Sequence, residues 1–182
     1  MIIIGYQGIG KSSAATDNLS FIDLESSSFW VNGKRADDWY VVYAQIAEHL
    51  SKQGYTVFVS SHQALRDRLA RSTEKVVEIY PSHEIKEDWL RRLKYRLMTD
   101  PSEKNKRAYE GAVGYYDANI DSFEEDRGHY MYMELRTINY KLEDVIDAIF
   151  EIDDLWASEF PDVKVTLNRF YYTEAGNVFS MP

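Results

Sequence analysis

Residues 1–12 read MIIIGYQGIGKS, and this stretch decides the fold. Its last eight residues fill every required position of the pattern G-x-x-x-x-G-K-[ST], which is typical of a phosphate-binding loop. The four apolar residues before the loop read as a buried strand, and residues 12–17 can begin a helix whose N-terminus faces the phosphates. Because the motif requires this strand–loop–helix context, the sequence predicts that the chain binds a nucleoside triphosphate; the alternative is a plain glycine-rich turn.

The residues of this loop have separate chemical roles. Glycines at positions 5, 8 and 10 let the backbone wrap a phosphate, since a side chain there would block the N–H groups or forbid the dihedral angles. Lys11 would reach the β- and γ-phosphates, and the Ser12 hydroxyl would ligate Mg²⁺. We therefore expect ATP to contact Gly5, Gly8, Ile9, Gly10, Lys11, Ser12 and Ser13.

Composition limits the class of protein. A chain of 182 residues with 45% hydrophobic and 28% charged residues is expected to form one globular domain, with at most a small appendage. No apolar run is long enough to span a bilayer, and no basic leader precedes the first strand. The absence of cysteine excludes disulfides and thiolate metal sites, so we expect a cytoplasmic protein.

The charge is acidic overall but uneven. A net charge of −9 disfavours binding to duplex nucleic acid. Residues 91–107 nevertheless hold seven basic and two acidic residues, a local net charge of +5. A basic patch in an acidic chain favours a small anionic ligand over a polymer.

Short apolar strands alternate with amphipathic helices along the chain, a pattern that predicts a parallel sheet covered on both faces. We expect five strands, within residues 1–4, 21–24, 56–60, 75–80 and 129–135. The predicted helices carry apolar stripes, which are Trp39, Val42, Tyr43, Ile46 and Leu50; Ile85, Trp89, Leu93 and Leu97; Tyr109, Val113, Tyr116, Ile120 and Phe123; and Leu142, Val145, Ile146 and Ile149.

The C-terminal segment is less regular. Residues 163–167 alternate like a strand, and residues 170–172 and 178–179 are expected to form a hairpin. Its aromatic residues are expected either to pack on the body of the protein or to form a contact in a homo-oligomer.

With these segments in view, the chain resembles small P-loop kinases of the adenylate kinase, shikimate kinase and gluconate kinase group. The resemblance rests on the phosphate loop, on Phe21-Ile22-Asp23-Leu24-Glu25, on Arg92-Leu93-Lys94-Tyr95-Arg96 after the fourth strand, and on the last strand with the helix of residues 142–146. It implies a three-layer α/β/α P-loop NTPase fold with a five-stranded, mainly parallel sheet and a helical lid. The kinase-like domain would span residues 1–152, with the lid at about 91–110 and an extension at 153–182.

The chain departs from that group in two places. Asp23 comes only 12 positions after Lys11, so the helix after the loop is short. The third strand is followed by Ser60-Ser61-His62 instead of an acidic residue. An ordinary Walker B acid is therefore missing there, which argues against a mechanical or signalling NTPase.

Acidic residues after the second strand are the candidates for metal binding and proton transfer. Asp23 would hold Mg²⁺ together with Ser12, directly or through water, and could accept a proton from a substrate hydroxyl. Glu25 faces the same side if the strand continues, and would bind the acceptor. The alternative is that both residues merely end the strand.

Basic residues supply the other candidates. Arg92 and Arg96 lie one helical turn apart, and the resemblance implies that they close over ATP and stabilise transition-state charge. After the third strand, Arg66 could hold an acceptor phosphate and His62 could contact the acceptor. The competing interpretations are that the lid arginines are merely exposed to solvent, that Arg66 pairs at the surface with Asp67 or Glu74, and that His62 is structural.

The region after the second strand is where an acceptor would bind. Aromatic residues gather there, and they could stack a base, although core packing is the commoner use. Residues 32–35 read as a turn whose basic pair could touch the acceptor, although a solvated turn is the favoured interpretation.

The sequence therefore favours an ATP- and Mg²⁺-dependent kinase of a nucleotide or nucleoside. A regulatory ATP-binding module and a kinase of polynucleotide 5′-hydroxyl ends remain the alternatives.

Overall fold

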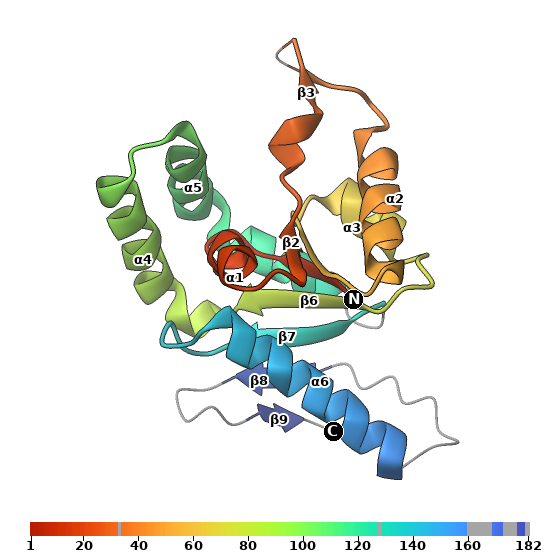
Figure 1. Ribbon diagram of the computed structural model, residues 1–182. Coiled ribbons are helices and arrows are strands. Elements are labelled where there is room, and N and C mark those ends of the chain that lie inside the picture. The colour runs from red at the N-terminus through yellow and green to blue at the C-terminus, as the bar shows by residue number, and fades with distance from the viewer. Residues whose placement is uncertain (33, 127–128, 160–168, 173–177, 181–182) are drawn as a thin grey trace. The chain divides into compact units, whose positions relative to one another are not determined.

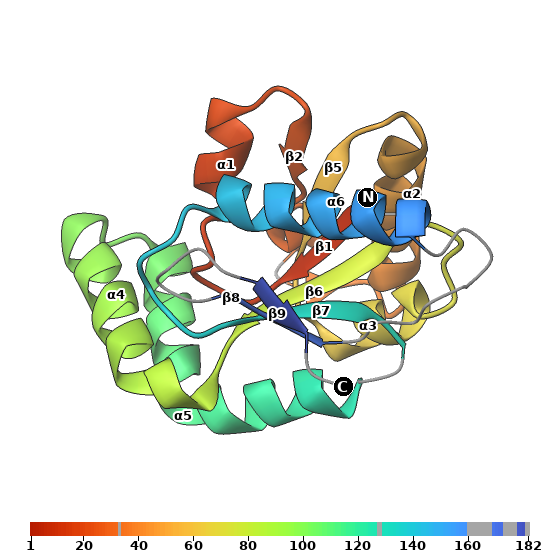
Figure 2. The same ribbon diagram turned by 90° about the horizontal axis from the view of Figure 1, so that it is seen from below.

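The computed structural model describes residues 1–32, 34–126, 129–159, 169–172 and 178–180. By its internal contacts the chain divides into two compact units, residues Met1–Ile79 and Tyr80–Pro182. Both units combine helices with strands, so the predicted α/β class is confirmed. All five predicted strands are present (Figures 1 and 2).

A parallel sheet forms the centre of the first unit. The order of its strands is β2-β5-β1-β6, and β1 pairs in parallel with both β5 and β6. Ile4 on β1 lies opposite Val59 on one side and Glu78 on the other. Residues Ile2, Ile3 and Ile4 are completely buried, as expected for a central strand covered on both faces. The strands are β1 (Ile2–Gly5), β2 (Phe21–Asp23), β5 (Thr56–Val59) and β6 (Val76–Pro81).

Three helices cover this sheet: α1 (Lys11–Asp17), α2 (Trp39–Lys52) and α3 (Gln63–Leu69). The connection from β1 to β2 runs in one direction across the sheet, and the connections from β2 to β5 and from β5 to β6 run in the other. Because such crossovers are right-handed, α1 lies on one face and α2 with α3 on the opposite face (Figure 2). The loop between β1 and α1 therefore lies at the carboxyl edge of the sheet.

Helix α2 uses a different face from the one that the sequence predicted. Its buried residues are Tyr43, Ala44, Ala47 and Ser51, whereas Val42 is 48% exposed and Ile46 is 39% exposed. The small alanine and serine side chains let the helix lie close to the sheet, so this face is turned inward in place of the larger aliphatic one. Gly54 follows the end of the helix with φ 91°, a left-handed conformation that glycine adopts readily at this position.

A short two-stranded hairpin lies between β2 and α2. After the 3₁₀ helix η1 (Ser26–Phe29), β3 (Trp30–Val31) pairs antiparallel with β4 (Lys34–Arg35). Asn32 adopts φ 52°, a left-handed conformation that asparagine tolerates better than most residues. The predicted turn at residues 32–35 is thus the tip of a hairpin that the sequence analysis had not identified.

In the second unit the last residues of β6 are followed in the sheet by β7, β8 and β9. Strand β8 pairs in parallel with β7, and β9 pairs antiparallel with β8. The predicted hairpin at residues 170–179 is therefore confirmed, while the strand predicted at residues 163–167 lies outside the described residues. The elements are η2 (His83–Ile85), α4 (Lys86–Thr99), α5 (Glu103–Glu125), β7 (Met131–Leu135), α6 (Leu142–Glu159), β8 (Arg169–Tyr172) and β9 (Val178–Ser180).

Helix α5 bends at Tyr115, where φ is −139°, and Figures 1 and 2 show the change of direction. The predicted stripe holds after the bend, because Tyr116, Ile120 and Phe123 are buried. It fails before the bend, where Val113 is 54% exposed. The prediction of one continuous apolar stripe was wrong, because the bend at Tyr115 gives the two halves of the helix different buried faces.

Helix α6 buries its predicted stripe of Leu142, Val145, Ile146 and Ile149. The helix continues beyond residue 152, where the sequence analysis placed a domain boundary, and ends at Glu159. Among the described residues, no helix combines the length and the apolar character needed to cross a bilayer.

Candidate functional site

The loop after β1 has the backbone shape that its glycines predict. Gly8 has φ 89° and Gly10 has φ 105°, values in the left-handed region that side chains disfavour. A Cβ atom on Gly5 would overlap Ile9 Cδ1 and lie 2.9 Å from Lys11 Cδ. Ile9 itself is 1% exposed, so the loop is packed around this side chain. The loop therefore needs glycine at position 5 for space and at positions 8 and 10 for backbone conformation.

Lys11 lies over this loop. Its ammonium donates hydrogen bonds to the carbonyl oxygens of Gly5, at 2.7 Å, and Tyr6, at 3.3 Å. These contacts hold the cation at the carboxyl end of β1. An anion bound in the loop would meet the positive charge there without a large movement of the backbone.

Ser12 and Asp23 join the loop to the next strand. The Ser12 hydroxyl donates a hydrogen bond of 2.6 Å to Asp23 Oδ2. Ser12 lies in the first turn of α1, and Asp23 is the last residue of β2. The predicted pair of Mg²⁺ ligands is thus in direct contact.

A buried tyrosine connects the carboxyl ends of β2 and β5. The Tyr43 hydroxyl donates to the carbonyl of Leu24 and accepts a 3.2 Å hydrogen bond from the Ser60 amide. Burial raises the pKa of Tyr43, so the hydroxyl stays protonated and can donate. Glu25, which follows Leu24, is half-buried and precedes η1. This clamp sets where the chain leaves the sheet and therefore where Glu25 lies.

His62 is neutral in this site. Desolvation by burial, together with the positive charges of Arg35 and Lys11, lowers the pKa of His62 to about 4. Arg35 Nη1 can only donate, so its 3.0 Å contact makes His62 Nε2 an acceptor. Nδ1 then carries the proton and donates to Ser60 Oγ at 2.8 Å. Both ring nitrogens are engaged, and His62 holds Arg35 rather than acting as a cation.

Arg35 belongs to the basic pair for which the sequence favoured a solvated turn, and the structure instead gives it aromatic and hydrogen-bond partners. Its guanidinium lies 4.3 Å from the ring centroid of Trp39 and 5.4 Å from that of Trp30. Its Nε and Nη2 donate to the carbonyl and hydroxyl of Ser26, at 3.2 and 2.9 Å. Desolvation lowers the pKa of Arg35, which remains a cation. Tryptophans on both sides of an arginine in sequence were the available signal.

Aromatic rings continue from this arginine into the unit. Trp39 stacks on Tyr43 with centroids 5.6 Å apart, and Phe29 contacts both rings. Trp39 also meets His62 edge to face at 5.0 Å. Trp30, in contrast, is 46% exposed. This group of aromatic rings is therefore buried at Tyr43 and accessible to solvent at Trp30.

Arg66 is part of the interior. Its side chain is 3% exposed, and its Nε lies 3.9 Å from Oε1 of Glu78, which is 1% exposed. Its Nη2 donates to the side chain of Gln63. The pairing with Asp67 or Glu74 that the sequence suggested is replaced by a buried pair with β6, and a role in binding acceptor phosphate stays a prediction.

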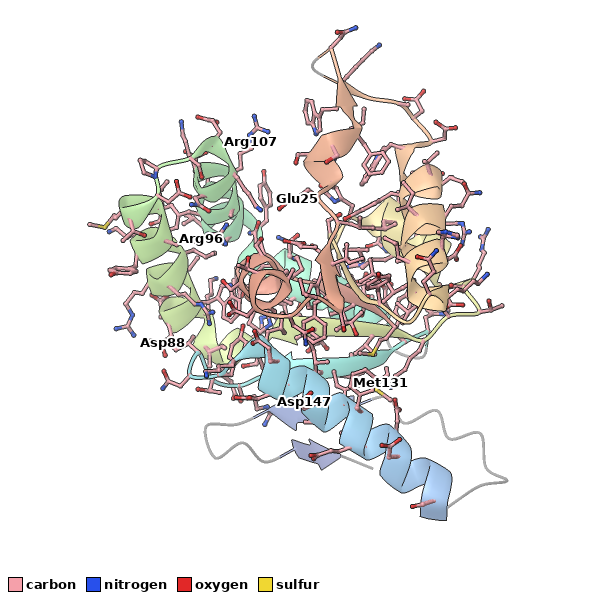
Figure 3. All side chains as sticks on the ribbon, in the orientation of Figure 1. Glu25, Asp88, Arg96, Arg107, Met131 and Asp147 are labelled. Carbon is pink, nitrogen blue, oxygen red and sulfur yellow. The ribbon has the colours of Figure 1, made fainter. Side chains whose placement is uncertain are left out.

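The two predicted lid arginines lie in the second unit and differ in their surroundings. Arg92 Nη1 donates to the Ile138 carbonyl at 3.3 Å, and its guanidinium lies 5.4 Å from the Trp89 ring and 5.1 Å from the Tyr140 ring. Arg96, also on α4, makes no ion pair or side-chain hydrogen bond within the described part of the chain (Figure 3). Arg92 is therefore part of a packed aromatic group, and the role of both arginines in closing over ATP stays a prediction.

Within the first unit, the structure brings together Lys11, Ser12 and Asp23, with Glu25 and His62 on the adjoining strand ends. This arrangement offers an ammonium, a hydroxyl and a carboxylate beside a glycine loop, which suits binding of a phosphate and a hard cation.

The chain matches no protein-family model and no curated protein sequence at a significant level.

Proposed function

We propose that the protein is an ATP- and Mg²⁺-dependent phosphotransferase of the P-loop type, acting on a small nucleotide or nucleoside. The observation that carries the proposal is the contact between Ser12 and Asp23 beside Lys11, at the end of a loop with the full G-x-x-x-x-G-K-S pattern. A glycine-rich turn that binds no ligand would not require an ammonium, a hydroxyl and a carboxylate side by side.

The residues suit Mg²⁺. This ion prefers hard oxygen ligands in an octahedral shell, where neighbouring ligand oxygens lie about 3 Å apart. The Ser12 and Asp23 oxygens are already 2.6 Å apart, so a slight separation makes room for an ion held by both, or by Ser12 with Asp23 acting through water.

The residues also suit a chain of phosphates. The positive φ angles of Gly8 and Gly10 suit a concave loop of successive backbone N–H groups, an arrangement that favours anions. Lys11 adds a full positive charge at the same end of β1. We propose that the Lys11 ammonium exchanges a carbonyl partner for a phosphate oxygen when nucleotide binds.

Phosphoryl transfer depends mainly on alignment and charge stabilisation, and bound Mg²⁺-ATP would supply the phosphoryl group and part of the neutralising charge. Lys11 would stabilise negative charge on the transferred group. Asp23 would hold the Ser12 hydroxyl and the ion. That role leaves Glu25 as the carboxylate for orienting the acceptor and, where the acceptor is a hydroxyl, for taking its proton.

The surroundings of Arg35 support a nucleotide or nucleoside as acceptor. Exposed Trp30 offers an aromatic face, and Arg35 offers a cation that His62 and Ser26 hold in place. An aromatic face stacks bases, and a fixed guanidinium favours phosphate. A sugar acid would use the cation without needing the ring.

The test is ADP production from Mg²⁺-ATP in the presence of nucleosides, nucleoside monophosphates, sugar acids or 5′-hydroxyl oligonucleotides. Lys11→Ala removes the loop ammonium, and Lys52→Ala removes an exposed lysine at the end of α2 as a matched control. We expect one nucleoside or nucleotide to stimulate turnover in the wild type and in Lys52→Ala, with a loss of about 100-fold or more in Lys11→Ala.

The other outcomes separate the alternatives. Stimulation only by oligonucleotides, with binding that weakens steeply as salt rises, would indicate a polynucleotide 5′-hydroxyl kinase. ATP binding without stimulation by any acceptor would favour a regulatory ATP-binding module. Equal activity in Lys11→Ala and wild type would refute the role given to the loop.

A further inference from the structure

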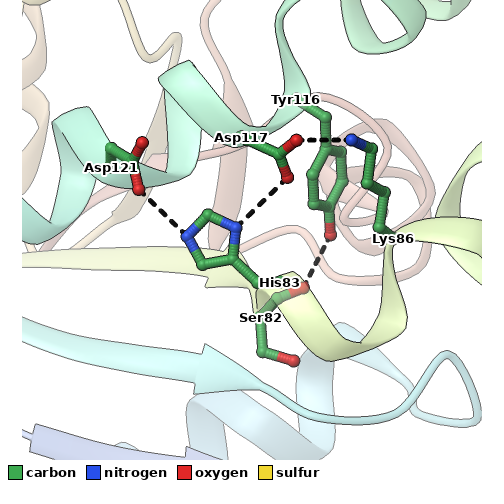
Figure 4. A network of polar contacts seen from close by, with 6 residues as sticks. All are labelled: Ser82, His83, Lys86, Tyr116, Asp117 and Asp121. Carbon is green, nitrogen blue, oxygen red and sulfur yellow. Dashed lines mark hydrogen bonds and ion pairs between the residues drawn. The ribbon is translucent and has the colours of Figure 1, made fainter.

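A second group of ligand-type side chains lies in the unit formed by residues 80–182, apart from the residues used above. His83 comes from η2, and Asp117, Asp121 and Glu124 come from the half of α5 that follows the bend. Figure 4 shows the histidine ring between two of these carboxylates.

The distances within the group are short. His83 Nδ1 lies 3.2 Å from Asp117 Oδ1, and His83 Nε2 lies 3.1 Å from Asp121 Oδ1. One ligand atom each from His83, Asp121 and Glu124 can be chosen so that all three lie within 4.8 Å of one another. A nitrogen and two carboxylates thus converge on one point from two separate elements.

The local fold fixes this convergence. Asp117, Asp121 and Glu124 are spaced four and three residues apart, so they share one face of the helix. Tyr116, directly before Asp117, is 1% exposed, and its hydroxyl donates a 2.8 Å hydrogen bond to the Ser82 carbonyl. That bond ties the helix to the residue before His83 and holds the histidine against the acidic face.

Asp117 has a partner that sets its position. Lys86 Nζ donates to Asp117 Oδ2, and the other carboxylate oxygen of Asp117 lies 3.2 Å from His83 Nδ1. This oxygen can accept a hydrogen bond from a protonated Nδ1. In metal sites a ligating histidine commonly donates its other ring N–H to such a carboxylate, which fixes the ring and directs its free lone pair at the metal.

We propose that His83 Nε2, Asp121 and Glu124 bind a divalent first-row transition metal ion, with Asp117 as the carboxylate that orients His83. One imidazole and two carboxylates are a ligand set that Zn²⁺ accepts, and a water completes four-coordination. The purely hard ion Mg²⁺ is less suited, because nitrogen replaces oxygen in its shell. The site would tie η2, and so the start of α4, to the second half of α5.

The experiment measures Zn²⁺ binding to the full chain by competition with a coloured chelator, after all metal has been removed and without nucleotide. We expect one saturable site. His83→Gln and Glu124→Gln should each abolish it, and Asp117→Asn should weaken it by about 10- to 100-fold, the usual effect of losing an orienting carboxylate.

Two control variants match these changes. His129→Gln removes an exposed histidine of the same unit, and Asp23→Asn removes the carboxylate of the candidate Mg²⁺ site. Both should bind Zn²⁺ as the wild type does. Zn²⁺ should also raise the Tm of the wild type and of both controls, but not that of His83→Gln or Glu124→Gln, since a ligand stabilises only the state that binds it.

A Co²⁺-substituted sample gives a second readout, because ligation by His83 would produce a visible absorption band that His83→Gln loses. The absence of saturable Zn²⁺ binding would overturn the proposal. So would binding that survives in both His83→Gln and Glu124→Gln, or that is lost in Asp23→Asn. If His83→Gln fails to fold, Glu124→Gln and Asp117→Asn decide the matter.

Discussion

The neutral state of His62 predicts how the stability of the protein depends on pH. The ordinary pKa of histidine is about 6.5, and burial with Arg35 and Lys11 nearby lowers the pKa of His62 to about 4. Between these values the unfolded chain binds a proton at this position and the folded chain does not. The free energy of unfolding that His62 contributes is therefore fully present above pH 6.5, and it is lost as the pH falls from 6.5 to about 4.

The magnitude follows from the shift and from the exposure of the ring. A difference between 6.5 and about 4, at about 1.4 kcal/mol per pH unit, sets a ceiling of about 3.5 kcal/mol. His62 keeps part of its surface exposed to solvent, so water screens the charges and reduces the effect. We expect about 1 kcal/mol of pH-dependent stability from this residue.

The measurement compares urea unfolding between pH 4 and pH 7.5 for wild type, His62→Gln and the control His49→Gln. His49 is exposed near the end of α2, and its change should leave the pH dependence of unfolding as it is. We expect His62→Gln to flatten the curve between pH 4 and 6.5. Parallel curves for wild type and His62→Gln over this interval would refute a neutral His62, and a steeper curve for His62→Gln would mean that the pKa is raised.

Gly5→Ala should destabilise the protein by about 1–3 kcal/mol in urea unfolding, because the new methyl group overpacks the loop. In the control Gly114→Ala the new methyl group meets no atom within 4 Å, and this change should stabilise the protein by up to about 1 kcal/mol. Equal effects of the two substitutions would refute the steric argument. Tyr43→Phe should cost about 1–3 kcal/mol, since it leaves a carbonyl at the end of β2 and an amide at the end of β5 without their partner, and an unchanged urea midpoint would contradict the clamp. Arg92→Ala should cost about 1–2 kcal/mol through its lost aromatic and carbonyl contacts, while Arg96→Ala should leave the free energy of unfolding within about 0.5 kcal/mol of the wild-type value. A larger loss in urea unfolding for Arg96→Ala than for Arg92→Ala would refute this assignment.

Much of the fold could be predicted because its signals are local. The apolar run before Gly5 predicts a strand buried on both faces, and the observed β1 is completely buried from Ile2 to Ile4. The stripe on α6 was also predicted correctly, since an uninterrupted helix keeps one face inward. The stripes on α2 and α5 were predicted less well. Close packing of small side chains chose the face of α2, and the bend at Tyr115 divided α5.

The candidate site also contains some residues that could be identified from sequence and others that could not. Lys11, Ser12 and Asp23 could be identified from sequence, because the loop pattern and the end of a strand mark them. Arg35 could not, since its hairpin depends on contacts with Ser26, Trp39 and His62 that lie apart in sequence. The role of His62 depended on the same contacts.

The sequence by itself determined the α/β class, the five central strands, and the phosphate-loop pattern with its following hydroxyl and nearby carboxylate. These features rest on periodicity and on short spacings that neighbouring residues encode. The tertiary structure alone decided that Arg66 pairs with Glu78 in the interior, that Arg92 packs against aromatic rings, and that His83 meets the acidic face of α5. Such contacts join residues from separate elements, and only the folded chain sets the distances on which charge, hydrogen bonding and metal ligation depend.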